Sequence, residues 1–138
     1  FRIDKMNLAA LTATLIHSLK EEAQNKIPVW QMISAGLDDL RKRAHNVSTK
    51  IPKSDLYSLE VIGTKSTIGG GSLPGETMDS FGIQLKVNNP EQFALKIRTG
   101  SSPIVPRIED DTVIFDLRTV LQNDDETLIA SIAHSLKN

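Results

Sequence analysis

Apolar residues recur at helical spacing through the first third of the chain. They predict a helix over residues 5–20 with Asn7 as its N-cap, and a second helix over residues 34–47 capped by Ser34. The intervening stretch KIPVWQM contains Pro28, which cannot continue a helix from the preceding turn. A helix-to-helix connection is therefore expected there.

Beyond residue 50 the apolar spacing changes mostly to a period of two. It predicts four strands and two further helices. The strands are expected at residues 56–62, 81–87, 104–108 and 112–118, and the helices at residues 90–98 and 125–137. The resulting order α-α-β-β-α-β-β-α predicts an α+β fold, in which helices cover one face of a small, largely antiparallel sheet.

Composition narrows the classes of function. The 138 residues carry 16 basic and 17 acidic side chains, for a net charge of −1, which gives no electrostatic case for a dedicated nucleic-acid-binding or membrane-surface domain. The chain has no cysteine, which excludes disulfides, thiolate catalysis and cysteine zinc sites within it. No stretch approaches the ~20 apolar residues of a membrane span. The three histidines are far apart, so no metal site is expected.

The start of the chain points to a larger protein. It begins FRIDKMNLAAL, with no initiator methionine and almost no lead-in before the first helical pattern. We therefore expect this sequence to be a piece of a longer chain.

The run GGGSLPGET at residues 69–77 is the most unusual stretch. From Gly70 it matches the phosphate-loop pattern except at Glu76, where a carboxylate replaces the required lysine. The run also joins two predicted strands, so no helix N-terminus is available to bind phosphate. Pro74 breaks the dinucleotide-binding fingerprint, and the run is therefore not a nucleotide-binding loop. A flexible connection and a backbone wall near another surface or ligand both remain open.

Four stretches carry a resemblance to a known family. In order along the chain they are RIDKMNLAALTATL, IPVWQMIS, GGGSLPGE and PIVPRIEDDTVIFDLRTV. In order and spacing they resemble the bacterial L-seryl-tRNA(Sec) selenium transferases (selenocysteine synthases), over essentially the whole chain. The sequence departs after the glycine run, where the family tends to continue with Leu-Pro-Ser and this chain has Met78, Asp79 and Ser80.

The resemblance implies a fold-type-I pyridoxal-phosphate enzyme, with a large cofactor-binding domain and a small C-terminal domain. Residues 1–27 would then be the helix leading out of the missing large domain, and residues 28–138 the small domain. The resemblance implies that the lysine that forms the Schiff base lies just upstream of Phe1, and Lys5 matches another position of the pattern. This chain alone is expected to bind no cofactor and to be inactive.

The family's reaction converts seryl-tRNA(Sec) into selenocysteinyl-tRNA(Sec), with selenophosphate as the selenium donor and pyridoxal 5'-phosphate as the cofactor. The resemblance also implies a cytoplasmic homo-oligomer that does not associate with membranes. Two other interpretations remain open. The chain could be the small domain of a related pyridoxal-phosphate lyase acting on a small amino acid or amino sugar, or a free-standing binding or oligomerisation module.

Two arginines are candidate site residues under this resemblance. Arg2 matches a family arginine close to the cofactor lysine and is expected to bind an anion; the alternative is a surface arginine. In fold-type-I relatives a small-domain arginine commonly faces the substrate carboxylate. Here that carboxylate is esterified, so Arg107 would contact a tRNA phosphate or selenophosphate. The alternative is an ion pair with Glu109 or Asp116.

The remaining candidates are backbone and structural groups. Gly69, Gly70, Gly71 and Ser72 are expected to form a wall near the active site, at or near a subunit boundary. Arg118 is expected to serve structure. The basic run at residues 41–43 is expected to be a solvated helix face, with a tRNA contact as the alternative.

Overall fold

The computed structural model describes residues 2–68 and 75–137. Contacts divide the chain into two compact units, residues 1–35 and residues 36–138. The prediction that residues 1–27 lead out of a cofactor-binding domain concerns a part of the protein outside this chain, and it stays a prediction.

The first unit contains three helices: α1 (Lys5–Leu19), α2 (Ala23–Lys26) and α3 (Pro28–Ser34). The expected connection around Pro28 is therefore largely helical, because proline occupies the first position of α3, where its missing N–H costs no hydrogen bond. The N-cap of α1 is Asp4 rather than the predicted Asn7. Asp4 has extended backbone geometry, and its carboxylate accepts from the backbone N–H groups of Met6 at 2.9 Å and Asn7 at 3.0 Å.

The side chains of α1 are apolar around much of the helix, yet none of its residues is buried. Helices of this composition are usually covered by other protein. Its large exposed apolar side chains are Met6, Leu8, Leu11, Leu15, Ile16 and Leu19.

The cap of α1 predicts a pH dependence. The Asn7 backbone N–H, the largest influence, holds the pKa of Asp4 below its usual value of 3.8. The pKa of Asp4 is lower in the folded chain than in the unfolded chain. The stabilisation of α1 by this cap is therefore present above pH 3.8 and is lost as the pH falls through the folded pKa. We expect the NMR amide signals of Met6 and Asn7 to report loss of the first helical turn in that acidic range.

The matched control for this titration is Asp4→Asn, since asparagine caps helices as well as aspartate but does not titrate. In this variant the acid step at the Met6 and Asn7 amides should disappear. An identical step in both proteins would contradict the assignment of Asp4 as the cap.

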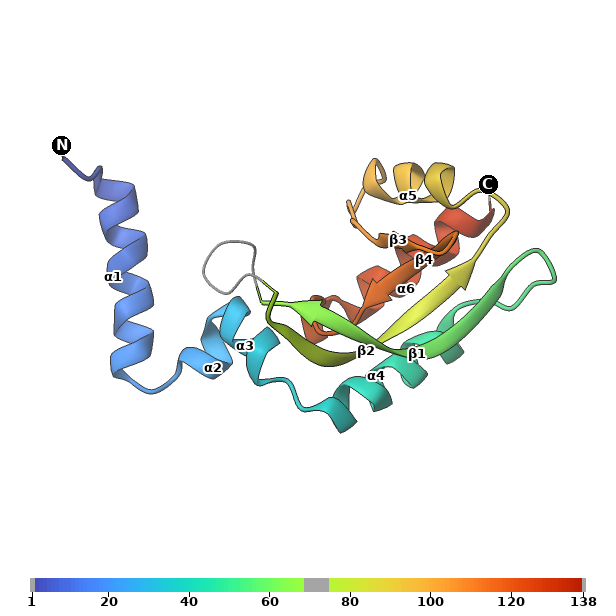
Figure 1. Cartoon of the computed structure of the whole chain (residues 1–138). Helices are drawn as coiled ribbons and strands as arrows, with labels where there is room; N and C mark the ends of the chain where they lie inside the picture. Colours follow the sequence, from blue (N-terminus) through green and yellow to red (C-terminus); the bar gives the residue numbers. More distant parts are fainter. Residues whose placement is uncertain (1, 69–74, 138) are drawn as a thin grey trace. The chain divides into compact units, whose positions relative to one another are not determined.

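The second unit is a four-stranded sheet with helices. Its elements are α4 (Leu37–Lys50), β1 (Ser58–Thr67), β2 (Thr77–Lys86), α5 (Pro90–Arg98), β3 (Arg107–Glu109), β4 (Thr112–Asp116), the 3₁₀ turn η1 (Gln122–Asp124) and α6 (Asp125–Lys137). The strands lie in the order β1-β2-β4-β3 and every pairing is antiparallel (Figure 1). The predicted α+β fold class is confirmed.

Helix α4 begins three residues later than predicted. Ser34 is the last residue of α3, and the chain then turns extended at Ala35 and Gly36. Gly36 is therefore the N-cap of α4, and Ser34 is not. Asp38 and Asp39 lie in the first turn of α4, where they complement the helix dipole.

The core lies between one sheet face and the helices. Alternation along β2 and β4 places four buried apolar residues on the same face: Ile83, Leu85, Val113 and Phe115. Helix α4 packs against β1 and β2, α5 against β3 and β4, and α6 contacts both of these helices. The opposite sheet face carries mostly polar residues, with Ile114 of β4 buried among them. In the part of the chain that the structure describes, no helix is long and apolar enough to cross a membrane.

Candidate functional site

The β1–β2 hairpin continues past the rest of the sheet. β1 and β2 pair along their whole lengths, whereas β2 pairs with β4 only from Gly82 to Leu85. One further bond, from the Leu117 N–H to the Phe81 carbonyl at 3.0 Å, ends that contact. We call residues 63–67 and 77–81 the hairpin arm. It leads into the segment that contains Gly69, Gly70, Gly71 and Ser72, which lies outside the described residues, so their predicted role stays a prediction.

Three polar side chains hold the hairpin arm, and we call them the polar clamp: Arg107, Asp116 and Arg118. Asp116, at the end of β4, is buried with 7% of its surface exposed. The Ser80 hydroxyl donates to Asp116 Oδ1 at 2.5 Å, the Arg118 backbone N–H donates to the same oxygen at 3.0 Å, and the Ser66 hydroxyl donates to Oδ2. One carboxylate thereby ties both strands of the arm to β4.

Arg118 holds the same arm through a backbone carbonyl. Its guanidinium Nη2 donates to the Asp79 carbonyl at 2.7 Å, and the residue is buried. The exposed side chain of Asp79 pairs with Lys65 across the arm. The hydrogen bond from the Lys65 ammonium has the largest effect on the pKa of Asp79 and holds it below its usual range. The charges of Lys65 and Arg118 lower this pKa further. These contacts agree with a structural role for Arg118.

Arg107 reaches the arm from β3. Its Nη1 donates to the Lys65 carbonyl at 2.8 Å and its Nη2 donates to the Thr64 hydroxyl at 2.7 Å. Its Nε lies 3.3 Å from Glu109 Oε1, an ion-pair distance without a hydrogen bond. The alternative prediction for Arg107 is an ion pair with Glu109 or Asp116. Arg107 pairs with Glu109. Among the described residues, Asp116 accepts instead from the two serine hydroxyls and the Arg118 backbone N–H.

The geometry leaves Arg107 able to bind an anion as well. A guanidinium has five N–H donors, two of them on each terminal nitrogen. Each terminal nitrogen of Arg107 uses one N–H on the arm, and no further acceptor is recorded for either among the described residues. The side chain is 39% exposed, so solvent-borne groups can reach it. Arg107 is thus anchored and still has donors available.

Arg2 belongs to the first unit. It lies just before α1 and is exposed. Its predicted role as an anion-binding residue stays a prediction.

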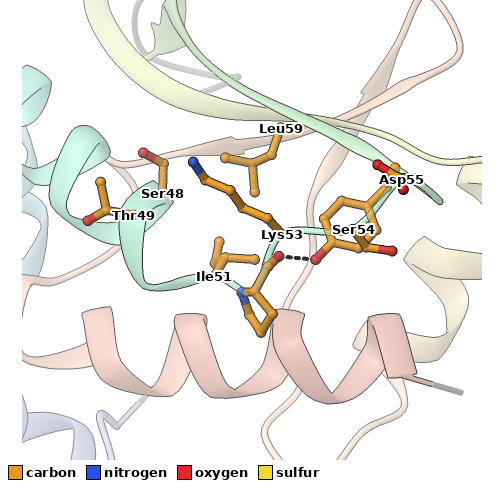
Figure 2. Close-up of a pocket in the computed structure, with 9 residues that line it drawn as sticks. Ser48, Thr49, Ile51, Lys53, Ser54, Asp55 and Leu59 are labelled. Atoms are coloured by element: carbon orange, nitrogen blue, oxygen red, sulfur yellow. Dashed lines mark hydrogen bonds between the residues drawn. The ribbon is translucent and has the colours of Figure 1, made fainter.

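An open pocket of about 630 Å³ surrounds Lys53 at the C-terminal end of α4 (Figure 2). The Lys53 side chain runs between Leu59 and Ile51 toward Ser48. A cofactor lysine with a phosphate cradle would need positive charge nearby. Here the last carbonyls of α4 bring partial negative charge, and the Asp55 carboxylate is in the lining. The lining therefore offers neither a helix N-terminus nor a second cation to hold the phosphate of pyridoxal phosphate.

Among residues 2–68 and 75–137, no group of three or more acidic or histidine side chains could hold a metal ion.

The interpretation of residues 41–43 as a solvated face is wrong for Arg43. Its side chain is 17% exposed and forms a double ion pair with Asp125: Nε lies 3.1 Å from Oδ2 and Nη2 lies 2.6 Å from Oδ1. It also donates to the carbonyls of Leu117 at 3.2 Å and Val120 at 3.0 Å. Helical spacing could have predicted this burial, because Arg43 lies three residues after the buried Leu40 and so shares its helix face.

These features define a small α+β domain with an anchored, partly exposed arginine beside an extended hairpin. The chain matches the family model described as L-seryl-tRNA selenium transferase over residues 1–121, a range that includes Arg2 and the polar clamp.

Curated relatives carry the same name. The chain is 34% identical over 126 residues to the L-seryl-tRNA(Sec) selenium transferase of Carboxydothermus hydrogenoformans, covering 89% of this chain and 27% of that protein. It is 31% identical over 135 residues to that of Clostridium perfringens, covering 95% and 29%. It is 34% identical over 142 residues to that of Clostridium botulinum, covering 99% and 30%. The chain belongs to the L-seryl-tRNA selenium transferase family, and it spans less than a third of these relatives' length.

Proposed function

We propose that this chain is the C-terminal part of an enzyme that converts seryl-tRNA(Sec) into selenocysteinyl-tRNA(Sec), with selenophosphate as the selenium donor. The observation that carries this proposal is the family match over residues 1–121, together with 34% identity over 99% of the chain to a relative of that name. The anchored Arg107 supports it, because both proposed substrates carry phosphate-type anions, which arginine binds well.

The cofactor of the proposed enzyme is pyridoxal 5'-phosphate, held by a lysine N-terminal to Phe1. The lysine pocket of this chain does not fit that group, so we assign this chain no part in covalently holding it. When bound, the cofactor supplies an electron sink for bond changes at the serine residue. The residues of this chain bind and orient the substrates. The enzyme is proposed to act in the cytoplasm as a homo-oligomer.

Three groups of this chain are proposed to contact the substrates. Arg107 binds a tRNA phosphate or selenophosphate through its remaining N–H donors. Arg2 is a second anion-binding residue, supported by its exposure and its place in the RIDK motif. The backbone of residues 69–72 forms a wall beside the site.

An assay of the intact enzyme tests the function. Purified enzyme containing this chain is incubated with seryl-tRNA(Sec) and selenophosphate, and the amino acid released from the tRNA is identified by mass spectrometry. We expect selenocysteine, and no turnover when free serine replaces seryl-tRNA. Turnover of free amino acids without any tRNA requirement would replace the proposal with the related lyase activity.

Arg107→Ala tests the proposed contact in the intact enzyme. Hydrogen bonds to charged groups contribute roughly 1.5–3 kcal/mol, so we expect the KM of the anionic substrate that it binds to rise at least about tenfold. Steady-state rates are measured while selenophosphate and seryl-tRNA are varied separately. The control is Arg98→Ala, an exposed arginine at the end of α5. Equal KM values for wild type and both variants would exclude a substrate contact by Arg107.

A further inference from the structure

We propose that Asp116 is a positioning residue for anion binding: by fixing the hairpin arm, its carboxylate sets the place at which Arg107 is anchored. The inference rests on the proposed role of Arg107 and deepens it. Asp116 would touch neither substrate nor cofactor, and its effect would pass through β1 to the Arg107 guanidinium.

The contacts form a continuous path from Asp116 to Arg107. The guanidinium of Arg107 is anchored on the Thr64 hydroxyl and the Lys65 carbonyl of β1. The next residue along that strand is Ser66, whose hydroxyl donates to Asp116 Oδ2. Thus Asp116 fixes the strand immediately beside the Arg107 anchor.

The second oxygen of the carboxylate fixes the neighbouring strand. Ser80 of β2 is the register partner of Thr64, and its hydroxyl donates to Asp116 Oδ1 at 2.5 Å. The anchor of Arg107 is therefore held both along its own strand and across the hairpin, each time by the same carboxylate.

The arm needs this support because the ladder between β2 and β4 stops at its base. The last register pair is Gly82 with Asp116, and the arm continues beyond it as two strands. An isolated two-stranded hairpin is at best marginally stable in water. A misplacement of a binding group by about 1 Å can cost as much as 10²-fold in rate, so a small twist of the arm is enough to weaken binding by Arg107.

The variant Asp116→Asn weakens one tie with little change of volume, because the charge-assisted bond from the Ser66 hydroxyl to Oδ2 gives way to one that the neutral amide donates to that hydroxyl. The Arg118 backbone N–H requires an acceptor, so the single amide oxygen of asparagine takes the place of Oδ1 and keeps its two donors. The amide NH₂ then faces Ser66 in place of Oδ2. The substitution therefore loosens β1, the strand that anchors Arg107. Ser66→Ala removes the same hydrogen bond by deleting the serine hydroxyl.

The test is a double-mutant cycle in the intact enzyme with Asp116→Asn, Arg107→Ala and both together. We expect Asp116→Asn to raise the KM of the anion that Arg107 binds by about three- to tenfold, and to add less than about twofold when Arg107 is already alanine. Ser66→Ala should reproduce the single effect. Glu60→Gln, which alters an exposed carboxylate on β1 outside the arm, is the matched control and should change KM less than about twofold.

The two substrates are varied separately, so the rise in KM shows whether the anion is selenophosphate or a phosphate of the tRNA. Unchanged KM values in Asp116→Asn and Ser66→Ala, with only a lower melting temperature, would reduce Asp116 to a structural residue and overturn the inference. An equal rise in KM with and without Arg107 would also overturn it. A wild-type enzyme that forms no selenocysteinyl-tRNA would instead show that the proposed function itself is wrong, and the inference would fail with it.

Discussion

Replacing Arg43 with alanine is expected to lower the free energy of unfolding of the second unit by about 2–4 kcal/mol, because it leaves a partly buried carboxylate without its charged partner. Asp125 is 14% exposed and would lose both of its hydrogen bonds from Arg43, while the Leu117 and Val120 carbonyls would each lose a donor. This loss is a large part of the roughly 5–15 kcal/mol that stabilises a typical domain. Urea unfolding of the 138-residue chain, followed by circular dichroism, measures it.

The matched control is the neighbouring Lys42→Ala. Lys42 is 79% exposed and its amine lies 3.7 Å from Asp39, a surface pair of the kind that contributes little. Its removal should change the free energy of unfolding by no more than about 0.5 kcal/mol. Similar losses in both variants would mean that the Arg43–Asp125 pair does not join α4 to α6 as described.

Gly82→Ala is expected to have the second large effect. A Cβ at this position would lie 2.6 Å from the Phe115 carbonyl oxygen, which belongs to the backbone of the adjacent β4. Since neither strand can move without breaking ladder bonds, we expect a loss of about 1–3 kcal/mol or more in the free energy of unfolding. The same unfolding experiment measures it.

Gly63 provides the opposite case on the neighbouring strand. It pairs with Phe81, one register position from Gly82, and a Cβ there would meet nothing within 4 Å. Gly63→Ala should stabilise the unit by about 0.5–1 kcal/mol, because glycine in a strand loses more backbone entropy on folding than alanine does. Destabilisation by both substitutions would contradict the close approach of β2 and β4 as its cause.

The sequence predicted the helices of the second half closely, and the reason is capping. Helix α5 has the predicted bounds, residues 90–98, because the Asn89 side chain caps it and Pro90 begins it. The strands of the arm were predicted too short. Their expected bounds followed apolar alternation, whereas β1 and β2 continue as a ladder through polar residues such as Ser66 and Ser80.

The candidate site was predictable only where its contacts are local. Arg107 and Glu109 are two residues apart on one strand, so they share a face and their pairing was foreseen as an alternative. The bonds of Asp116 to Ser66 and Ser80 span 50 and 36 residues. No local sequence pattern predicts such contacts, because they depend on how β1, β2 and β4 align with one another.

The location of an anion in crystals of the intact enzyme tests the proposed role of Arg107 most directly. With inorganic phosphate as the probe, we expect a phosphate oxygen within about 3.2 Å of Arg107 Nη1 or Nη2, while both nitrogens keep their bonds to the hairpin arm. A phosphate bound at the active site without contact to Arg107, with that guanidinium still directed only at Glu109 and the arm, would contradict it.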